Sequence, residues 1–327
     1  MTLPSITRES IFAIILACVM MLSMIGPAAA GSEFGSDTSE RSLSGAAGGV
    51  VAPQVDVDVT DLNGSGTQSE PYEIANASEL QAMEDDLDGN YELVSDINAS
   101  QTAQFNDGKG FDPIGGNKFN ESTPPPFNGS FEGNNHTVTG LTINRSEFPD
   151  SLSLGLFGVT DSGATLTDVT LENVTVISDN FNAGGLVGLN GGTVTNVTAS
   201  GSVTGDTDVG GLVGDNFGTI TTATASVNVT STKQFAPVGG LVGENRGEIR
   251  DTFAVGSVTD DFEAGGLVGF NDGTVEQSYF DTQATGQDIS GGSATGLTTD
   301  QMQGQAARTN MSGFDFENTW TTTSEYP

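Results

Sequence analysis

Cysteine is almost absent from this sequence, and that absence limits how the folded chain can be stabilised. The single cysteine, Cys18, lies in an apolar run near the N-terminus. An exported protein without disulfides must be stabilised by packing alone or by metal ions. The 327 residues are enough to bury a substantial core.

Basic residues are also scarce. Nine lysines and arginines stand against 43 aspartates and glutamates, giving a formal net charge of −34. Such self-repulsion destabilises a compact state unless salt screens it, and the screening length falls from about 10 Å at 0.1 M to about 3 Å at 1 M salt. Nucleic acid and anionic membranes are therefore poor partners. The composition indicates a secreted protein adapted to high salt, which we expect to fold only at molar salt.

The N-terminus has the pattern of an export signal. Residues 1–30 combine a short polar start, the apolar run IFAIILACVMMLSMIG and the small residues PAAA, and they predict a cleaved signal peptide. No membrane span is expected in the mature chain. Residues 31–68 are rich in Gly, Ser, Asp and Thr, with few large apolar side chains, and they predict a flexible acidic leader.

Residues 69–152 are expected to form a small α+β N-terminal cap followed by initial coils. The segment Asn76–Leu87 predicts a short amphipathic helix, because Leu80, Met83 and Leu87 fall at helical spacing. Asn76 and Ser78 compete as its N-cap. From Tyr91 onward the pattern changes to the alternation typical of strands.

Residues 153–287 contain an internal repeat. The pentapeptide GGLVG occurs four times, its second glycine recurring at steps of 26, 29 and 26 residues, and GLFG at Gly155 is a degenerate earlier copy. This period is typical of stacked units that cannot each bury their own apolar face. The repeat positions that we expect to be structural are Gly185, Leu186, Asn190, Gly211, Leu212, Asn216, Gly240, Leu241, Asn245, Gly266, Leu267 and Asn271.

Alignment of the copies separates inward from outward positions. Apolar columns run through the copies, and one of them is Leu166, Val194, Ile220, Ile249 and Val275. The next residue in each copy is polar or charged, which is the alternation of a strand. Identical residues at the same phase indicate coils stacked about 4.7–4.9 Å apart. The sequence therefore predicts an all-β fold: a right-handed parallel β-helix (β-solenoid) of about five coils.

The asparagine that follows each GGLVG by two residues has a predicted structural role. Stacked amides hydrogen-bond from coil to coil, and asparagine tolerates left-handed turns. The glycines are expected to supply positive φ angles and to allow close approach of adjacent turns. Residues 288–327 form a predicted C-terminal cap or tail, in which Thr298 and Gln301 cap a short helix.

These copies resemble the GLUG motif of bacterial and archaeal surface proteins. The segments SEPYEIANASELQAM, FDPIGG, FNGSFEGNNHTVTGLTI and YFDTQATGQ resemble the regions that flank such arrays, so the resemblance covers roughly residues 69–303. It implies an extracellular, adhesin-like β-helical region, with a haloarchaeal source, and it supplies no catalytic motif. The sequence reaches Pro327 without the apolar anchor helix that many haloarchaeal surface proteins have.

The sequence gives little support for catalysis. His136 is the only histidine, and no GxSxG, Walker or HExxH motif is present. The alternative is a polysaccharide-active β-helix enzyme, a glycoside hydrolase or lyase, which would need two carboxylates flanking a groove. The local acid pairs are Asp260 with Asp261, Asp206 with Asp208, and Asp85 with Asp86. Among so many acids such pairs arise by chance, so we predict a non-enzymatic protein without cofactors.

Two further kinds of site are suggested by short motifs. Asp61, Asn63 and Ser65 match the first half of a calcium loop, although the bidentate glutamate expected at the twelfth position is replaced by Tyr72. Eleven Asn-x-Ser/Thr sequons are candidates for glycosylation. They are Asn63, Asn76, Asn98, Asn120, Asn128, Asn135, Asn144, Asn173, Asn196, Asn228 and Asn310.

The sequence as a whole predicts an exported structural or adhesin-like glycoprotein at the cell surface. Its expected partners are cell-envelope components, glycans or other cells.

Overall fold

A computed structural model describes residues 57–116, 124–146, 153–179, 182–260, 264–322 and 324–327. All of them belong to one compact unit, residues 50–327. The predicted signal peptide, residues 1–30, and most of the predicted leader lie outside the described residues.

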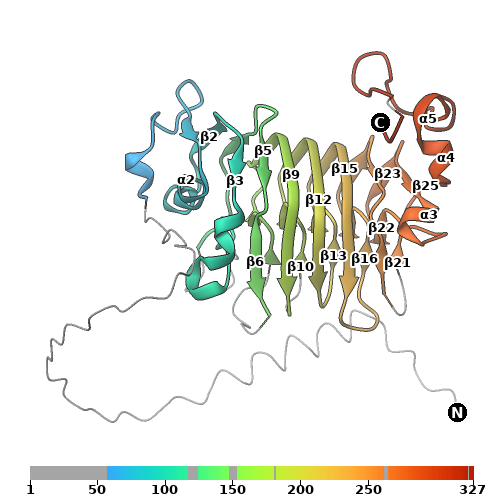
Figure 1. Ribbon diagram of the computed structural model, residues 1–327, viewed down its shortest axis with the longest axis horizontal. Helices are drawn as coiled ribbons and strands as arrows, with labels where there is room; N and C mark the ends of the chain where they lie inside the picture. The colour runs from blue at the N-terminus through green and yellow to red at the C-terminus, as the bar shows by residue number, and fades with distance from the viewer. Residues whose placement is uncertain (1–56, 117–123, 147–152, 180–181, 261–263, 323) are drawn as a thin grey trace, which may run out of the picture. The chain divides into compact units, whose positions relative to one another are not determined.

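The body of this unit is built from three parallel sheets (Figure 1). The largest has 15 strands, of which nine follow the path β1-β2-β4-β9-β12-β15-β19-β24-β25. The other six, β3, β5, β6, β18, β20 and β23, pair alongside this path. Two smaller sheets each contain five strands, in the orders β21-β16-β13-β10-β7 and β22-β17-β14-β11-β8. The parallel β-solenoid predicted from the repeat is thus confirmed, with five stacked coils and four steps between them.

Each coil contributes one strand to each small sheet and one or more to the large sheet. Coil 1 contains β7 (Ser153–Leu154), β8 (Phe157–Thr160) and β9 (Thr165–Ser178). Coil 2 contains β10 (Asn182–Ala183), β11 (Val187–Asn190) and β12 (Thr193–Gly205). Coil 3 contains β13 (Val209–Gly210), β14 (Val213–Asn216) and β15 (Thr219–Ser231).

The last two coils divide their long strand into shorter pieces. Coil 4 contains β16 (Val238–Gly239), β17 (Val242–Asn245), β18 (Glu248–Arg250), β19 (Phe253–Ala254) and β20 (Val258–Thr259). Coil 5 contains β21 (Ala264–Gly265), β22 (Val268–Asn271), β23 (Thr274–Glu276) and β24 (Tyr279–Asp281).

The N-terminal region extends the large sheet. Its strands are β1 (Tyr72–Ile74), β2 (Asn90–Leu93), β3 (Ile97–Asn98), β4 (Ser130–Glu132), β5 (Thr137–Thr139) and β6 (Thr142–Arg145), and β4, β5 and β6 all pair with β9. Four short 3-10 helices are η2 (Val59–Asp61), η3 (Ala82–Asp85), η4 (Ser100–Gln104) and η5 (Asn106–Gly108).

The helix expected over Asn76–Leu87 is present but shorter. It is α2 (Ala77–Gln81), followed directly by η3. Asn76 is the N-cap, because its side chain accepts hydrogen bonds from the backbone N–H groups of Ser78 and Glu79. Leu80 and Met83 are fully buried.

The C-terminal region follows coil 5 with α3 (Thr282–Thr285), β25 (Thr295–Leu297), α4 (Thr299–Met302) and α5 (Gly304–Asn310). Thr298 and Gln301 form the expected capping box of α4. A separate aromatic cluster packs here: Phe253 of β19 lies 5.5 Å from Trp320 between ring centroids, and Trp320 stacks on Phe314 at 4.5 Å. This cluster covers one face of coils 4 and 5 with side chains that the repeat does not supply.

The core of the solenoid consists of stacked apolar columns. The repeat leucines, Leu156, Leu186, Leu212, Leu241 and Leu267, have no exposed surface. Thr195, Thr221, Arg250 and Glu276 stand in register on the outward side of the neighbouring column. The predicted alternation of inward and outward residues is therefore what the register shows.

The repeat glycines serve close packing, and their expected positive φ angles are not found. A Cβ on Gly211 would lie 2.2 Å from the carbonyl oxygen of Gly240 in the next coil, and one on Gly240 would lie 2.3 Å from that of Gly266. The left-handed backbone lies instead at another corner of each coil. Its column is Asp168, Asn196, Thr222, Asp251 and Gln277.

The repeat asparagines form a continuous chain of side-chain hydrogen bonds. The Nδ2 group of Asn190 donates to Oδ1 of Asn216 at 2.8 Å, and Asn216 donates to Asn245 at 2.8 Å. Asn245 in turn donates to Asn271 at 2.7 Å. Asn190, Asn216 and Asn245 have no exposed surface, so this chain satisfies buried amides from coil 2 to coil 5.

Candidate functional site

One position of the repeat differs chemically from coil to coil. The residue between the closing glycine and the asparagine of GGLVG-x-N forms a column in register. This column reads Val159, Leu189, Asp215, Glu244 and Phe270. Two carboxylates are therefore stacked on adjacent coils, between apolar residues on either side.

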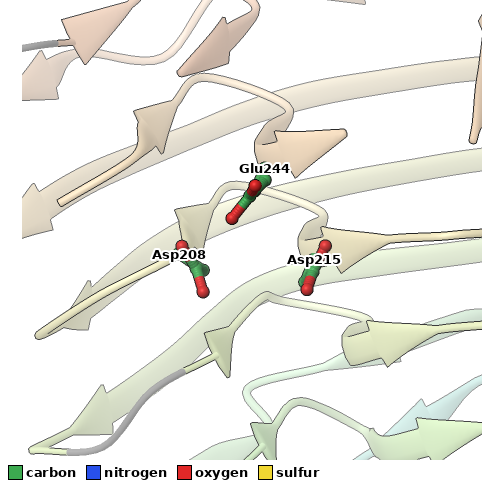
Figure 2. Close-up of side chains that lie close together, drawn as sticks. All are labelled: Asp208, Asp215 and Glu244. Atoms are coloured by element: carbon green, nitrogen blue, oxygen red, sulfur yellow. The ribbon is translucent and has the colours of Figure 1, made fainter. Parts of the chain in front are cut away.

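A third carboxylate joins this pair from the corner of coil 3. Asp208 immediately precedes β13, whereas Asp215 lies on β14 and Glu244 on β17. One carboxylate oxygen of each residue lies within 4.8 Å of the others. Figure 2 shows the three side chains gathered together from neighbouring turns of the backbone. We call these three residues the acidic cluster.

Arg246 partly neutralises the acidic cluster. Its Nη1 lies 2.5 Å from Oδ2 of Asp215, and its Nη2 lies 2.6 Å from Oε1 of Glu244. The guanidinium also lies 4.8 Å from the ring centroid of Phe217, whose residue is 52% exposed. One cation thus bridges two coils and is covered by an aromatic ring on the outside.

Burial sets the protonation of this site. Desolvation raises the pKa of Asp208 to about 8, helped by the charges of Glu244 and Asp215 and opposed by Arg246. Desolvation also raises the pKa of Asp215, against the attraction of Arg246. The guanidinium of Arg246 therefore does not offset the cost of burying the charged forms of these carboxyl groups.

Asp215 also has an oxygen without a partner. Its side chain is 8% exposed, and its buried Oδ1 accepts no hydrogen bond from any residue that the structure describes. A buried carboxylate oxygen without a donor is costly. The other oxygen, Oδ2, is the one that pairs with Arg246.

The acid pairs considered from the sequence have separate surroundings. Asp208 belongs to the acidic cluster, whereas Asp206 forms an ion pair with Lys233 at 2.7 Å. Asp85 accepts a hydrogen bond from the backbone of Val59. Asp260 lies just after β20, and Asp261 lies outside the described residues. Sequence reasoning missed Asp215 and Glu244, although their shared repeat position was a signal that could have revealed them.

A hollow of about 490 Å³ lies at coil 5. It is lined by Asn271, Gly273, Thr274, Val275, Glu276, Gln277, Gly292 and Ser293. The only carboxylate in this lining, Glu276, lies 3.1 Å from Arg250. The lining contains no aromatic side chain, so it does not have the carboxylate pair and stacking platform that glycoside hydrolysis would use.

The calcium-loop residues lie in a tight turn before β1. The amide of Asn63 donates to the carboxylate of Glu73 at 3.1 Å, and the hydroxyl of Ser65 donates to that of Glu70 at 3.0 Å. Asp61 ends η2. Calcium binding at Asp61, Asn63 and Ser65 stays a prediction.

Most of the sequons that the structure describes are accessible. Asn144 and Asn310 are half-buried, and Asn120 lies outside the described residues. The exposed ones are Asn63, Asn76, Asn98, Asn128, Asn135, Asn173, Asn196 and Asn228.

Comparisons with known proteins agree with the repeat. The family model of the GLUG motif matches residues 179–204, which include all of coil 2 except Gly205. Halomucin from Haloquadratum walsbyi is 36% identical over 310 residues, which cover 81% of this chain and 3% of Halomucin. A protein of Evansella cellulosilytica, named as a candidate Gly-rich membrane protein, is 34% identical over 140 residues, 41% of this chain and 15% of the relative. The chain thus spans a small part of these relatives.

A solved structure is similar in fold. The crystal structure of a candidate immunoglobulin A1 protease from Bacteroides ovatus matches with a TM-score of 0.54 at 20% identity, covering 74% of this chain and 72% of that one. At this identity the likeness shows the fold alone. Together with the repeat and the register, these comparisons support a coarser statement: the chain contains a GLUG motif, is similar in sequence to Halomucin, and is built on a parallel β-solenoid.

Proposed function

We propose that this protein is a structural, adhesin-like component of the cell surface that presents the outward face of its solenoid to other molecules. The partners that we propose are cell-envelope components, glycans or other cells. The observation that carries the proposal is the polar outer surface of the three long strands β9, β12 and β15, which contain 14, 13 and 13 residues. β12 and β15 pair in continuous register, and β9 and β12 pair with one register shift between Ala199 and Gly201.

The outward rows of this surface are hydroxyl and amide side chains. Thr195 lies opposite Thr221, with 3.1 Å between their Oγ1 atoms, and Ser202 lies opposite Asn228. Further pairs are Thr193 with Thr219, Ser200 with Ser226, and Thr204 with Thr230. The exposed Thr198 pairs with Thr224, which is buried. Groups that both donate and accept hydrogen bonds at the spacing of a sheet are suited to contacts with hydroxyl-rich ligands.

Glycosylation would enlarge this surface. Asn173 and Asn196 are exposed on β9 and β12, and Asn228 is exposed on β15. We propose that some of these sequons carry glycans after export. The intact mass of protein purified from its native source tests this, and a mass equal to the bare polypeptide would contradict it.

Adaptation to high salt belongs to the same proposal. The net charge of −34 favours a folded state only where mobile ions screen the carboxylates. We expect the far-ultraviolet circular dichroism of a strand-rich fold in concentrated KCl and its loss in dilute buffer. Identical spectra in the two solutions would contradict salt dependence.

The proposed surface location is supported by the predicted export signal in residues 1–30 and by the names of the sequence relatives. In the part of the chain that the structure describes, no helix is long and apolar enough to cross a membrane. From the predicted export signal and the relatives, we propose that the folded protein is exposed at the outside of the cell.

The contact role is tested by binding of the purified chain to isolated cell envelopes in 1 M KCl. We expect saturable binding that Thr198→Arg weakens, because Thr198 is exposed on β12 in the centre of the polar face. Gln305→Arg on α5 is the matched control, an equal change at an exposed site away from this face. Absence of saturable binding, or equal loss in both variants, would overturn the proposed role of the face.

A further inference from the structure

We propose that the acidic cluster of Asp208, Asp215 and Glu244 is a binding site for a divalent cation, and that Ca²⁺ is the ion that fits it. The proposal goes beyond the surface role and does not depend on it. It assigns a metal site to residues outside the predicted calcium loop.

Three oxygen ligands converge from two coils. One oxygen from each residue lies within 4.8 Å of the others, and Figure 2 shows the three side chains grouped together. Ca²⁺ binds oxygen at about 2.3–2.6 Å, so ligands on opposite sides of the ion are about 4.6–5.2 Å apart. This separation is the largest that two ligands of one Ca²⁺ can have, and the three oxygens lie within 4.8 Å of one another. They are therefore close enough to bind one Ca²⁺ after small shifts of the side chains, with waters completing the shell.

Asp215 has one carboxylate oxygen that lacks a hydrogen-bond partner among the described residues. Its Oδ1 is buried and accepts no hydrogen bond from a described residue, while Oδ2 is held by Arg246 at 2.5 Å. The side chain as a whole is 92% buried, since 8% of its surface is exposed. A cation between Asp208, Asp215 and Glu244 would give this oxygen the positive partner that no described residue provides.

The carboxylates of the acidic cluster carry more negative charge than Arg246 offsets. The three carboxylates, when ionised, carry three negative charges, and Arg246, which contacts Asp215 and Glu244, contributes one positive charge. Two negative charges remain, and a divalent ion neutralises them. Carboxylate ligands alone favour hard cations such as Ca²⁺ over zinc or copper, which prefer nitrogen or sulfur.

The site would tie adjacent coils together. Asp208 and Asp215 belong to the backbone of coil 3, and Glu244 belongs to β17 of coil 4. An ion bound by all three stabilises only the stacked arrangement, because the unfolded chain does not bring these residues together. Bound Ca²⁺ therefore raises the denaturation midpoint.

The test is calorimetric titration of the purified full chain with CaCl₂ in 1 M KCl, which screens weak binding to the acidic surface. We expect saturable binding and a Ca²⁺-dependent rise in the thermal midpoint relative to EGTA. Asp208→Asn should weaken binding about tenfold or more. This variant changes no ion pair of Arg246, and its circular dichroism checks that it is folded. MgCl₂ is the comparison ion, for which we expect weaker binding because its ligand distances are shorter.

Two control variants decide where the ion binds. Glu248→Gln removes the same charge beside Arg250, in a cluster with two carboxylates instead of three, and should leave the affinity unchanged. Asp61→Asn alters the predicted calcium loop and should also leave this binding unchanged. The proposal is overturned by absence of saturable binding in the native chain, by native affinity in Asp208→Asn, or by equal loss in Glu248→Gln. Loss of all binding in Asp61→Asn would place the ion in the loop and overturn it too.

Discussion

Two arginines of coil 4, four positions apart, each lie between two carboxylates, yet their surroundings differ. Arg246 contacts Asp215 and Glu244, whose side chains are 8% and 13% exposed. Arg250 contacts Glu248 and Glu276, whose side chains are 43% and 50% exposed. The same charges are thus desolvated on one face of the coil and solvated on the other.

The outward positions of this solenoid are therefore not equivalent. Along the strand that contains Arg250, solvent and salt screen the ion pairs, which contribute little to stability. Around Arg246 the low exposure strengthens each interaction and raises the cost of each unmatched charge. We therefore expect a special chemical role at Arg246 and none at Arg250, and the following variants measure the contrast.

The largest effect is expected inside the same coil. Leu241→Ala removes a fully buried side chain from the leucine column and should cost about 2–5 kcal/mol of unfolding free energy. Urea denaturation in 1 M KCl measures it. Thr221→Ala, on the outward side, should change the value by no more than about 0.5 kcal/mol. Equal losses would contradict the assignment of inward and outward columns.

The inward and outward columns could be predicted from the sequence because the repeat is strict. Leu212 and Leu241 recur at one phase, and strand alternation then determines what faces inward, so the solenoid could be predicted before its register was seen. The right-handedness expected for its crossovers stays a prediction.

The left-handed corner could not be found in the same way. Its column contains Asp168, Asn196, Thr222, Asp251 and Gln277, so no single residue type recurs in every coil. Backbone geometry is repeated there without a repeated side chain. The sequence instead predicts positive φ angles at the repeat glycines, whereas these glycines allow the coils to pack closely.

Only part of the acidic cluster could be predicted from the sequence. The sequence identifies Asp208 as a candidate only through its pairing with Asp206. In the structure Asp206 forms an ion pair with Lys233 instead. Asp215 and Glu244 occupy the variable position of the repeat, where Leu189 stands in coil 2. Their proximity depends on register between copies 29 residues apart, and the contribution of Asp208 depends on the shape of a corner that repeats poorly in sequence.

The next effect concerns Arg246 itself. Arg246→Ala removes the cation that contacts Asp215 and Glu244. The carboxylates are buried but the Arg246 side chain is 32% exposed, so the loss should cost about 2 kcal/mol in EGTA, less than for a fully buried pair. Urea denaturation again measures it. If the proposed metal site exists, saturating Ca²⁺ should recover part of the loss, since the ion neutralises the same carboxylates. A midpoint equal to that of the native chain would show that the low exposure of these acids has no energetic consequence.

A third arginine, Arg145, extends the comparison to the N-terminal coils. Burial raises the pKa of the neighbouring Glu84 from 4.5 to about 8; the charges of Asp112 and Asp85 add to this shift and Arg145 opposes it. The folded state therefore binds a proton more tightly than the unfolded chain does. Stability that this group contributes is present below pH 4.5 and is lost as the pH rises towards about 8.

Glu84→Gln tests this pH dependence, because glutamine keeps the shape of the protonated acid without titrating. The fall in thermal midpoint between pH 5 and 8 should be smaller in the variant than in the native chain, with salt held at 1 M KCl. Glu317→Gln, at an exposed position, is the matched control and should leave the slope unchanged. Parallel curves for the native chain and Glu84→Gln would contradict the raised pKa.

The smallest effect is expected at Arg250. Its partners Glu248 and Glu276 are about half exposed, so water replaces the guanidinium when Arg250→Ala removes it. The denaturation midpoint in 1 M KCl should stay close to that of the native chain, while Arg246→Ala lowers it clearly. Salt sharpens the contrast, because exposed pairs weaken with screening and buried pairs do so much less. If both variants lost stability equally at every salt concentration, exposure would not be what separates the two arginines, and the argument for a special site at Arg246 would fail.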